Sequence, residues 1–137
     1  MNTKNSILIL LLFVNTSFIK AQQDEKVETT KKLISLFHAK EFEKITPLFD
    51  KTMKAALPKE KLETVWMQLT NQMGDYVRYS TITTEKVQGY DIVYLLCEFK
   101  KGKLRMKTVF NQENQISGLF FIPEVDASSA PPYKTAS

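Results

Sequence analysis

The spacing of apolar residues divides the chain into a helical first half and a strand-rich second half. Over residues 25–39 apolar positions recur every three to four residues, which predicts an amphipathic helix, with Asp24 placed to cap it. A shorter helix is expected over residues 42–49, where Pro47 limits it to one or two turns, followed by an irregular stretch over residues 50–57.

The most regular helical pattern lies in the middle of the chain, over residues 58–73. Pro58 suits the opening of a helix because its missing N–H would have no partner there. Gly74 follows the last apolar residue, where a closing residue with positive φ is wanted. The apolar positions that define this helix are Leu62, Val65, Trp66, Leu69 and Met73.

After residue 75 the pattern changes to the alternation that is typical of strands. We expect strands over residues 76–84, 90–99, 103–110 and 115–122, joined by short turns. The second is apolar on both faces, which predicts cover on both sides, by helices or by a partner. Three helices followed by four sequential strands indicate an α+β fold, with the helices packed on one face of a curved antiparallel sheet.

The first 21 residues have the pattern of a secretory signal peptide. Lys4 precedes an apolar run over residues 6–18, and Ala21 offers a cleavage site. The run is too short for a membrane-spanning helix, so we expect an exported protein, periplasmic or secreted, without an integral membrane segment. The organisation predicted is a signal peptide (1–21), one α+β domain (22–124) and a flexible tail (125–137).

Charge and cysteine content narrow the classes of function. The chain has 19 Lys+Arg and 15 Asp+Glu, and loss of Lys4 and Lys20 with residues 1–21 would leave a net charge of 17 − 15 = +2. A net charge this small does not indicate a nucleic-acid-binding protein. Cys97 is the single cysteine, so the fold has no intramolecular disulfide and depends on its core. Within its apolar run we expect Cys97 to be a small buried residue.

Several packing and turn residues serve as landmarks for comparison with known families. They are Phe42 with Phe49, Leu57-Pro58, Trp66 with Leu69, Gly74, Cys97-Glu98-Phe99 and Ile116 to Pro123. Together they resemble a bacterial family known as domain of unknown function 3887, over roughly Val27 to Pro123. The resemblance implies the cone-shaped fold of the nuclear transport factor 2-like superfamily, and a frequent position before secreted α/β-hydrolase domains.

The residues of a hydrolase or a metal site are not found in the sequence. The chain has no Gly-x-Ser-x-Gly motif, and His38 is its only histidine, so no hydrolase triad can be built from it. A histidine in the last turn of a helix also interacts favourably with the helix dipole and needs no further role. We therefore expect no metal site and no cofactor.

Three hypotheses of function remain. The first is a non-catalytic binding or oligomerisation module, which would take a small apolar ligand or a protein partner, or dimerise through its sheet. The second is a small-molecule enzyme with Glu98 or Asp91 as general base, assisted by Tyr90 or Tyr94. The third is a detached accessory domain that docks on a separate α/β-hydrolase. The residues that would line a ligand pocket are Trp66, Tyr94, Glu98, Phe110 and Phe120.

Overall fold

The computed structural model describes residues 3–124, with side chains from residue 20 onward. The predicted tail over residues 125–137 lies outside the described residues. The elements, in chain order, are α1 (Thr3–His38), the 3₁₀ turns η1 (Phe42–Lys44) and η2 (Thr46–Leu48), α2 (Lys51–Ala56), α3 (Lys59–Met73), β1 (Tyr76–Val87), β2 (Tyr90–Phe99), β3 (Gly102–Phe110) and β4 (Ile116–Pro123).

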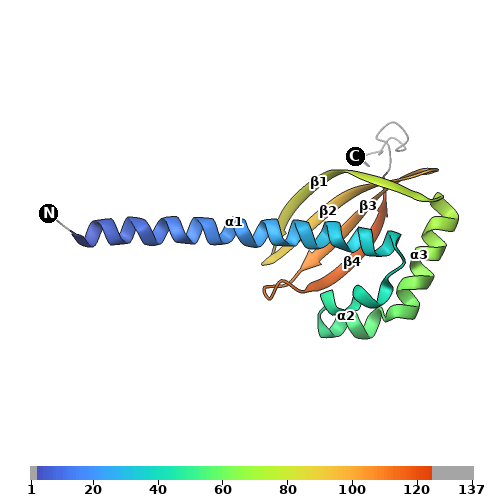
Figure 1. Ribbon diagram of the computed structural model, residues 1–137, viewed down its shortest axis with the longest axis horizontal. Coiled ribbons are helices and arrows are strands. Elements are labelled where there is room, and N and C mark those ends of the chain that lie inside the picture. Colours follow the sequence, from blue (N-terminus) through green and yellow to red (C-terminus); the bar gives the residue numbers. More distant parts are fainter. Residues whose placement is uncertain (1–2, 125–137) are drawn as a thin grey trace, which may run out of the picture.

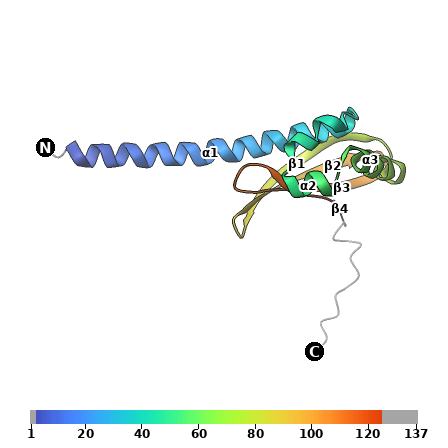
Figure 2. The same cartoon turned by 90° about the horizontal axis from the view of Figure 1, so that it is seen from below.

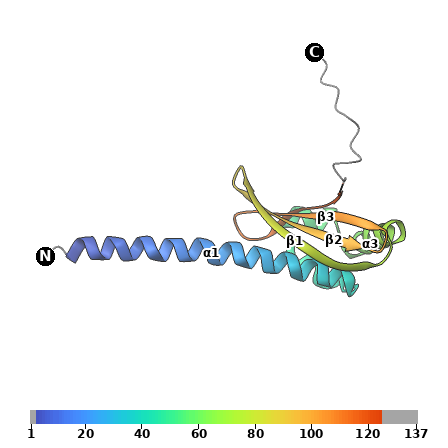
Figure 3. The same ribbon diagram turned by 90° about the horizontal axis from the view of Figure 1, so that it is seen from above.

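The four strands form one sheet in the order β1-β2-β3-β4, and every neighbouring pair is antiparallel. The helices lie on one face of this curved sheet, with α1 crossing it and α3 standing beside one end (Figure 1). The views from below and from above show the same two layers (Figures 2 and 3). The predicted α+β class is confirmed, and the arrangement is consistent with the expected cone.

Strand β2 shows how the two faces of the sheet differ. Val93, Leu95 and Cys97 alternate along the strand, are buried, and belong to the core shared with the helices. Tyr94 and Leu96 point the other way and are only half-buried. No helix in the described part of the chain covers this second face, so the helices supply only half of the cover that we expected for β2.

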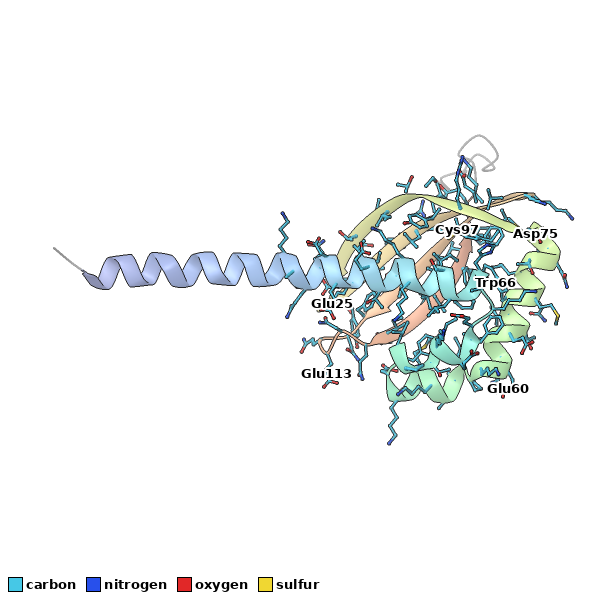
Figure 4. The ribbon with its side chains drawn as sticks, in the orientation of Figure 1. Glu25, Glu60, Trp66, Asp75, Cys97 and Glu113 are labelled. Carbon is cyan, nitrogen blue, oxygen red and sulfur yellow. The ribbon has the colours of Figure 1, made fainter. Side chains whose placement is uncertain are left out.

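Aromatic rings fill the centre of the core. Phe37, at the end of α1, is completely buried, and its ring centroid lies 5.2 Å from that of Trp66 and 5.7 Å from that of Phe121. Trp66 also lies 6.0 Å from Phe99. Figure 4 labels Trp66 and Cys97 in this layer between helices and sheet. Such pairs add about 1 kcal/mol each to the free energy gained by burying the rings.

Four predicted boundaries were wrong, and each has a local cause. Helix α1 does not begin after Asp24 but continues from Thr3, because no glycine or proline interrupts the run of residues before Asp24. The stretch predicted to be irregular contains α2, which Asp50 caps by accepting a hydrogen bond from the Met53 N–H at 2.8 Å. Pro58 is the N-cap of α3 rather than its first residue. Strand β1 continues to Val87, beyond the predicted end at residue 84.

Candidate functional site

A groove of about 500 Å³ runs between α3 and the edge strand β4. Residues from both faces of β4 line it, so it follows the free edge of the sheet. Two glutamines, Gln68 and Gln72, are its only polar side chains among the described residues. The apolar residues that line it are Phe37, Leu57, Leu62, Val65, Leu69, Leu119, Phe120, Phe121 and Ile122.

The rim of this α3–β4 groove exposes large apolar side chains. Phe120 is 54% exposed and Ile122 is 41% exposed, although both belong to a regular strand. The start of β4 is covered, because Phe49 bridges to Ile116 and the Asp50 N–H donates to the Ile116 carbonyl at 2.9 Å. Beyond that bridge the named strands give β4 only one neighbour, β3. An uncovered strand edge offers backbone donors and acceptors to another chain.

The five residues predicted to line a pocket do not come together. Trp66 and Phe110 are buried in the core. Tyr94 and Glu98 lie on the helix-free face of the sheet, since they share the parity of Leu96 on β2. Phe120 is registered beside Lys107 on this same face and lines the rim of the α3–β4 groove. Strand parity was predicted correctly, but which face the helices cover could not be known from parity alone.

Glu98 lies among cations on the helix-free face. Its Oε2 accepts a hydrogen bond from Nε of Arg78, and its Oε1 lies 3.7 Å from Nζ of Lys103. Both partners are registered beside it on neighbouring strands. This is the environment of a surface ion pair and not of a general base in an apolar cavity.

Asp91 has the opposite orientation and faces the helix layer. It forms an ion pair with Lys26 of α1, whose side chain is almost completely buried. The two residues belong to the wall of a second cavity, at the end of the sheet where β1 turns into β2. Sequence reasoning missed Lys26, although it lies one turn before Thr30 and two turns before Leu33 on the core stripe of α1.

The candidate tyrosines and the histidine occupy ordinary structural positions. The Tyr94 hydroxyl donates to Oε2 of Glu85 at 3.0 Å. Desolvation and this hydrogen bond both raise the pKa of Tyr94. Tyr90 is exposed beside the β1–β2 turn. His38 is exposed at the end of α1, with its ring edge-on to Tyr76 at 5.2 Å between centroids.

The Cys97 thiol is buried on the helix-facing side of β2, as predicted. Burial raises the pKa of the Cys97 thiol to about 12. A nucleophilic cysteine requires a thiolate at neutral pH, and this environment opposes it.

The residues that the structure describes hold neither a metal-binding cluster nor a membrane-spanning helix. Within them, no group of three or more His, Cys, Asp or Glu side chains is placed to hold a metal ion. Nor does any described helix have the length and apolar character needed to cross a membrane.

The fold and the groove together define a small α+β domain with helices on one face of an antiparallel meander and an uncovered apolar edge. A family model for "Protein of unknown function (DUF3887)" matches residues 30–119. The chain therefore belongs to this family. A search of curated proteins and a search of solved structures each gave no match.

Proposed function

We propose that the protein is a non-catalytic binding module whose α3–β4 groove receives an extended, uncharged segment of a partner polypeptide. The observation that carries this proposal is the apolar groove along a free strand edge, with Phe120 and Ile122 exposed at its rim. Large apolar side chains that remain exposed in a groove are typical of interaction sites.

The chemistry of the groove favours a polypeptide over a small apolar ligand. An added strand pairs its backbone with the open edge of β4 and inserts alternate side chains into the apolar floor. Gln68 and Gln72 on α3 face the same groove and offer amide groups to the other edge of that strand. A small apolar molecule would use neither the strand edge nor these amides.

Peptide selection followed by mapping tests this proposal. Uncharged ten-residue peptides are displayed and selected against the purified protein, and the amide signals of the protein are followed by NMR during titration. We expect shifts in β4 and α3, and N-methylation of alternate peptide residues should abolish binding because it removes backbone donors. Shifts confined to the helix-free sheet face, or full binding by the N-methylated peptide, would contradict the proposal.

Two exposed aromatic residues provide a matched pair of variants. Phe120→Ser removes a ring at the rim of the groove, whereas Tyr90→Ser removes a similarly exposed ring at the far turn of the sheet. We expect Phe120→Ser to weaken peptide binding at least about tenfold, because buried aromatic anchors dominate such interfaces. Tyr90→Ser should leave the affinity unchanged, and equal losses in both variants would show that the groove is not the binding site.

The settings of Glu98 and Asp91 support a non-catalytic role. Each carboxylate is ion-paired, one on an open face and one beneath α1. Neither residue lines the apolar α3–β4 groove. Substrate turnover that is lost in Glu98→Gln or Asp91→Asn would favour the enzyme hypothesis instead.

Dimerisation through the helix-free sheet face is the second candidate. Val87 and Tyr90 are exposed at the far end of β1 and β2. Ion pairs lie across the opposite end of this face, among them Arg105 with Glu124 at 3.1 Å. Burying such pairs costs desolvation energy that the attraction often fails to repay. Sedimentation equilibrium distinguishes the cases, since a stable dimer that Tyr90→Ser dissociates would favour the sheet face.

We also propose that the protein is exported after removal of residues 1–21. The first half of α1 projects away from the domain in all three views (Figures 1–3). Among the α1 residues whose side chains are described, Leu33 is the first member of the hydrophobic core and Val27 is the first that packs against it, so cleavage after Ala21 would leave the core intact. Mass spectrometry of the exported fraction should give a mature chain that begins at Gln22. An uncleaved chain retained in the cytoplasm would contradict this.

The partner of the α3–β4 groove could be a separate α/β-hydrolase. Co-purification of such a hydrolase with the protein would test this.

A further inference from the structure

A second cavity, of about 330 Å³, lies where α1 passes over the end of β1 and β2. Unlike the α3–β4 groove it has charged walls, which include Lys26, Lys86 and Asp91. Gln23 closes one side, where its Nε2 donates to Oγ1 of Thr84 at 2.9 Å. Polar groups that converge on a concave space are the usual feature of a small-molecule site.

The buried ammonium of Lys26 is the unusual feature of this cavity. Lys26 is 6% exposed, while the carboxylate of its partner Asp91 is 34% exposed and faces the opening. Desolvating a lysine costs free energy, and a buried ion pair is often no more stabilising than apolar residues of the same volume. Stability alone therefore gives a weak reason for placing Lys26 here.

Both partners keep hydrogen-bonding capacity that no described residue uses. The Lys26 ammonium has three donors, and only Oδ2 of Asp91 accepts from it among the described side chains. Oδ1 of Asp91 accepts no hydrogen bond from any residue that the structure describes. The pair thus offers donors and an acceptor a few ångströms apart, at the wall of the cavity.

The charge around the pair selects the ligand. Lys86 is registered directly opposite Asp91 on β1, so two cations and one anion meet on this side of the sheet. Glu85 also borders the cavity, but it is registered beside Ile92 and its Oε2 accepts from the Tyr94 hydroxyl, so its carboxylate lies on the helix-free face. On the helix-facing side two ammonium groups meet one carboxylate, which favours a single carboxylate on the ligand.

We propose that this cavity binds a small carboxylate that carries a neighbouring hydrogen-bond donor, such as a hydroxy acid. The carboxylate lies between the ammonium groups of Lys26 and Lys86, and the hydroxyl donates to Oδ1 of Asp91. Charge-assisted hydrogen bonds of this kind are the stronger class in proteins. This site is separate from the α3–β4 groove and does not depend on what the groove binds.

Lactate and propionate form a matched pair of probes, since they differ mainly in the hydroxyl group. NMR titration of the purified protein should show saturable shifts of the Lys26, Thr84 and Asp91 amides with lactate. Propionate should bind about tenfold more weakly, because it cannot donate to the carboxylate of Asp91. Equal affinities for the two probes, or no saturable shift of these amides up to about 100 mM lactate, would overturn the proposal.

Variants then test which groups hold the probe. The double variant Lys26→Met/Asp91→Asn removes both charges, so neither is left buried without its partner, and it should weaken lactate binding at least about tenfold. Lys31 and Glu28 form an exposed pair on the same helix, 2.7 Å between Nζ and Oε1. Lys31→Met/Glu28→Gln should leave lactate binding unchanged. Unchanged binding in the first double variant would overturn the proposal, and the probe comparison decides the matter if that variant does not fold.

Discussion

Phe110 and Phe120 were both candidate pocket residues, and the structure predicts opposite effects when each is replaced by alanine. Phe110 on β3 is completely buried, whereas Phe120 on β4 is 54% exposed. Phe110→Ala should destabilise the protein strongly without any direct effect on binding. Phe120→Ala should leave the free energy of unfolding almost unchanged and weaken peptide binding at the α3–β4 groove.

The magnitudes follow from burial. A buried phenylalanine removes about 150–250 Å² from water, and at about 25 cal/mol per Å² this corresponds to about 4–6 kcal/mol. Because alanine keeps part of that area and the site relaxes, we expect Phe110→Ala to cost about 4 kcal/mol. Phe120→Ala removes a partly exposed ring and its contact with Lys107, whose Nζ lies 5.6 Å from the ring centroid. That loss should amount to about 1 kcal/mol or less.

Urea unfolding monitored by fluorescence measures both values in one experiment. Trp66 is the only tryptophan in the chain and is 3% exposed, so its emission reports loss of the core. The slope of the transition should stay the same in both variants, because the surface exposed on unfolding hardly changes. A difference between the two variants below about 2 kcal/mol would refute the separation of core and groove on which the proposed function rests.

Three further predictions concern single positions. Because burial raises the pKa of Cys97 to about 12 from 9.0, the unfolded state loses this proton first. The free energy of unfolding should therefore fall as the pH rises from about 9 towards 12. Measured by urea unfolding over this pH range, it should fall less in Cys97→Ala than in the unsubstituted protein. Gly74→Ala should cost about 1–3 kcal/mol in the same assay, since φ there is +78° and a Cβ would lie 3.1 Å from that of Lys100. Asp50→Ala should cost about 1 kcal/mol through loss of the cap of α2. An unchanged free energy of unfolding would contradict the positive-φ argument in Gly74→Ala and the capping argument in Asp50→Ala.

The helices and strands could be predicted because their periodicity depends on local sequence. The α3 stripe through Leu62 and Trp66 and the alternation along β2 both correspond to observed elements. Helix α2 was missed because its six residues are too few for a periodic pattern, and its main signal was the cap at Asp50. The start of α1 was misjudged because one Asp inside a helix costs only about 0.7 kcal/mol, and no glycine or proline precedes Asp24 to end the helix there.

The predicted pocket failed for a reason that sequence patterns cannot supply. Alternation tells which residues share a face, as it did for Tyr94 and Glu98, but the choice of face is made by where the helices dock. An aromatic residue in a strand has the same pattern whichever face it occupies. Phe110 and Phe120 are therefore equivalent in sequence, and the register distinguishes them, because it places Phe110 beside Asp91 under the helices and Phe120 beside Lys107 on the helix-free face.

The strand order explains why both proposed sites lie at the margins of the domain. Phe37 and Trp66 are buried between the helices and the sheet, with their ring centroids 5.2 Å apart. The sheet is longer than the cover that the helices provide, which leaves the edge of β4 and the β1–β2 end partly open. A ligand at either proposed site would therefore meet residues at the rim of the fold, such as Phe120 and Asp91, that contribute little to the central core. It follows that substitutions at the rim should change binding without unfolding the protein, whereas substitutions at the centre should unfold it without any selective effect on either site.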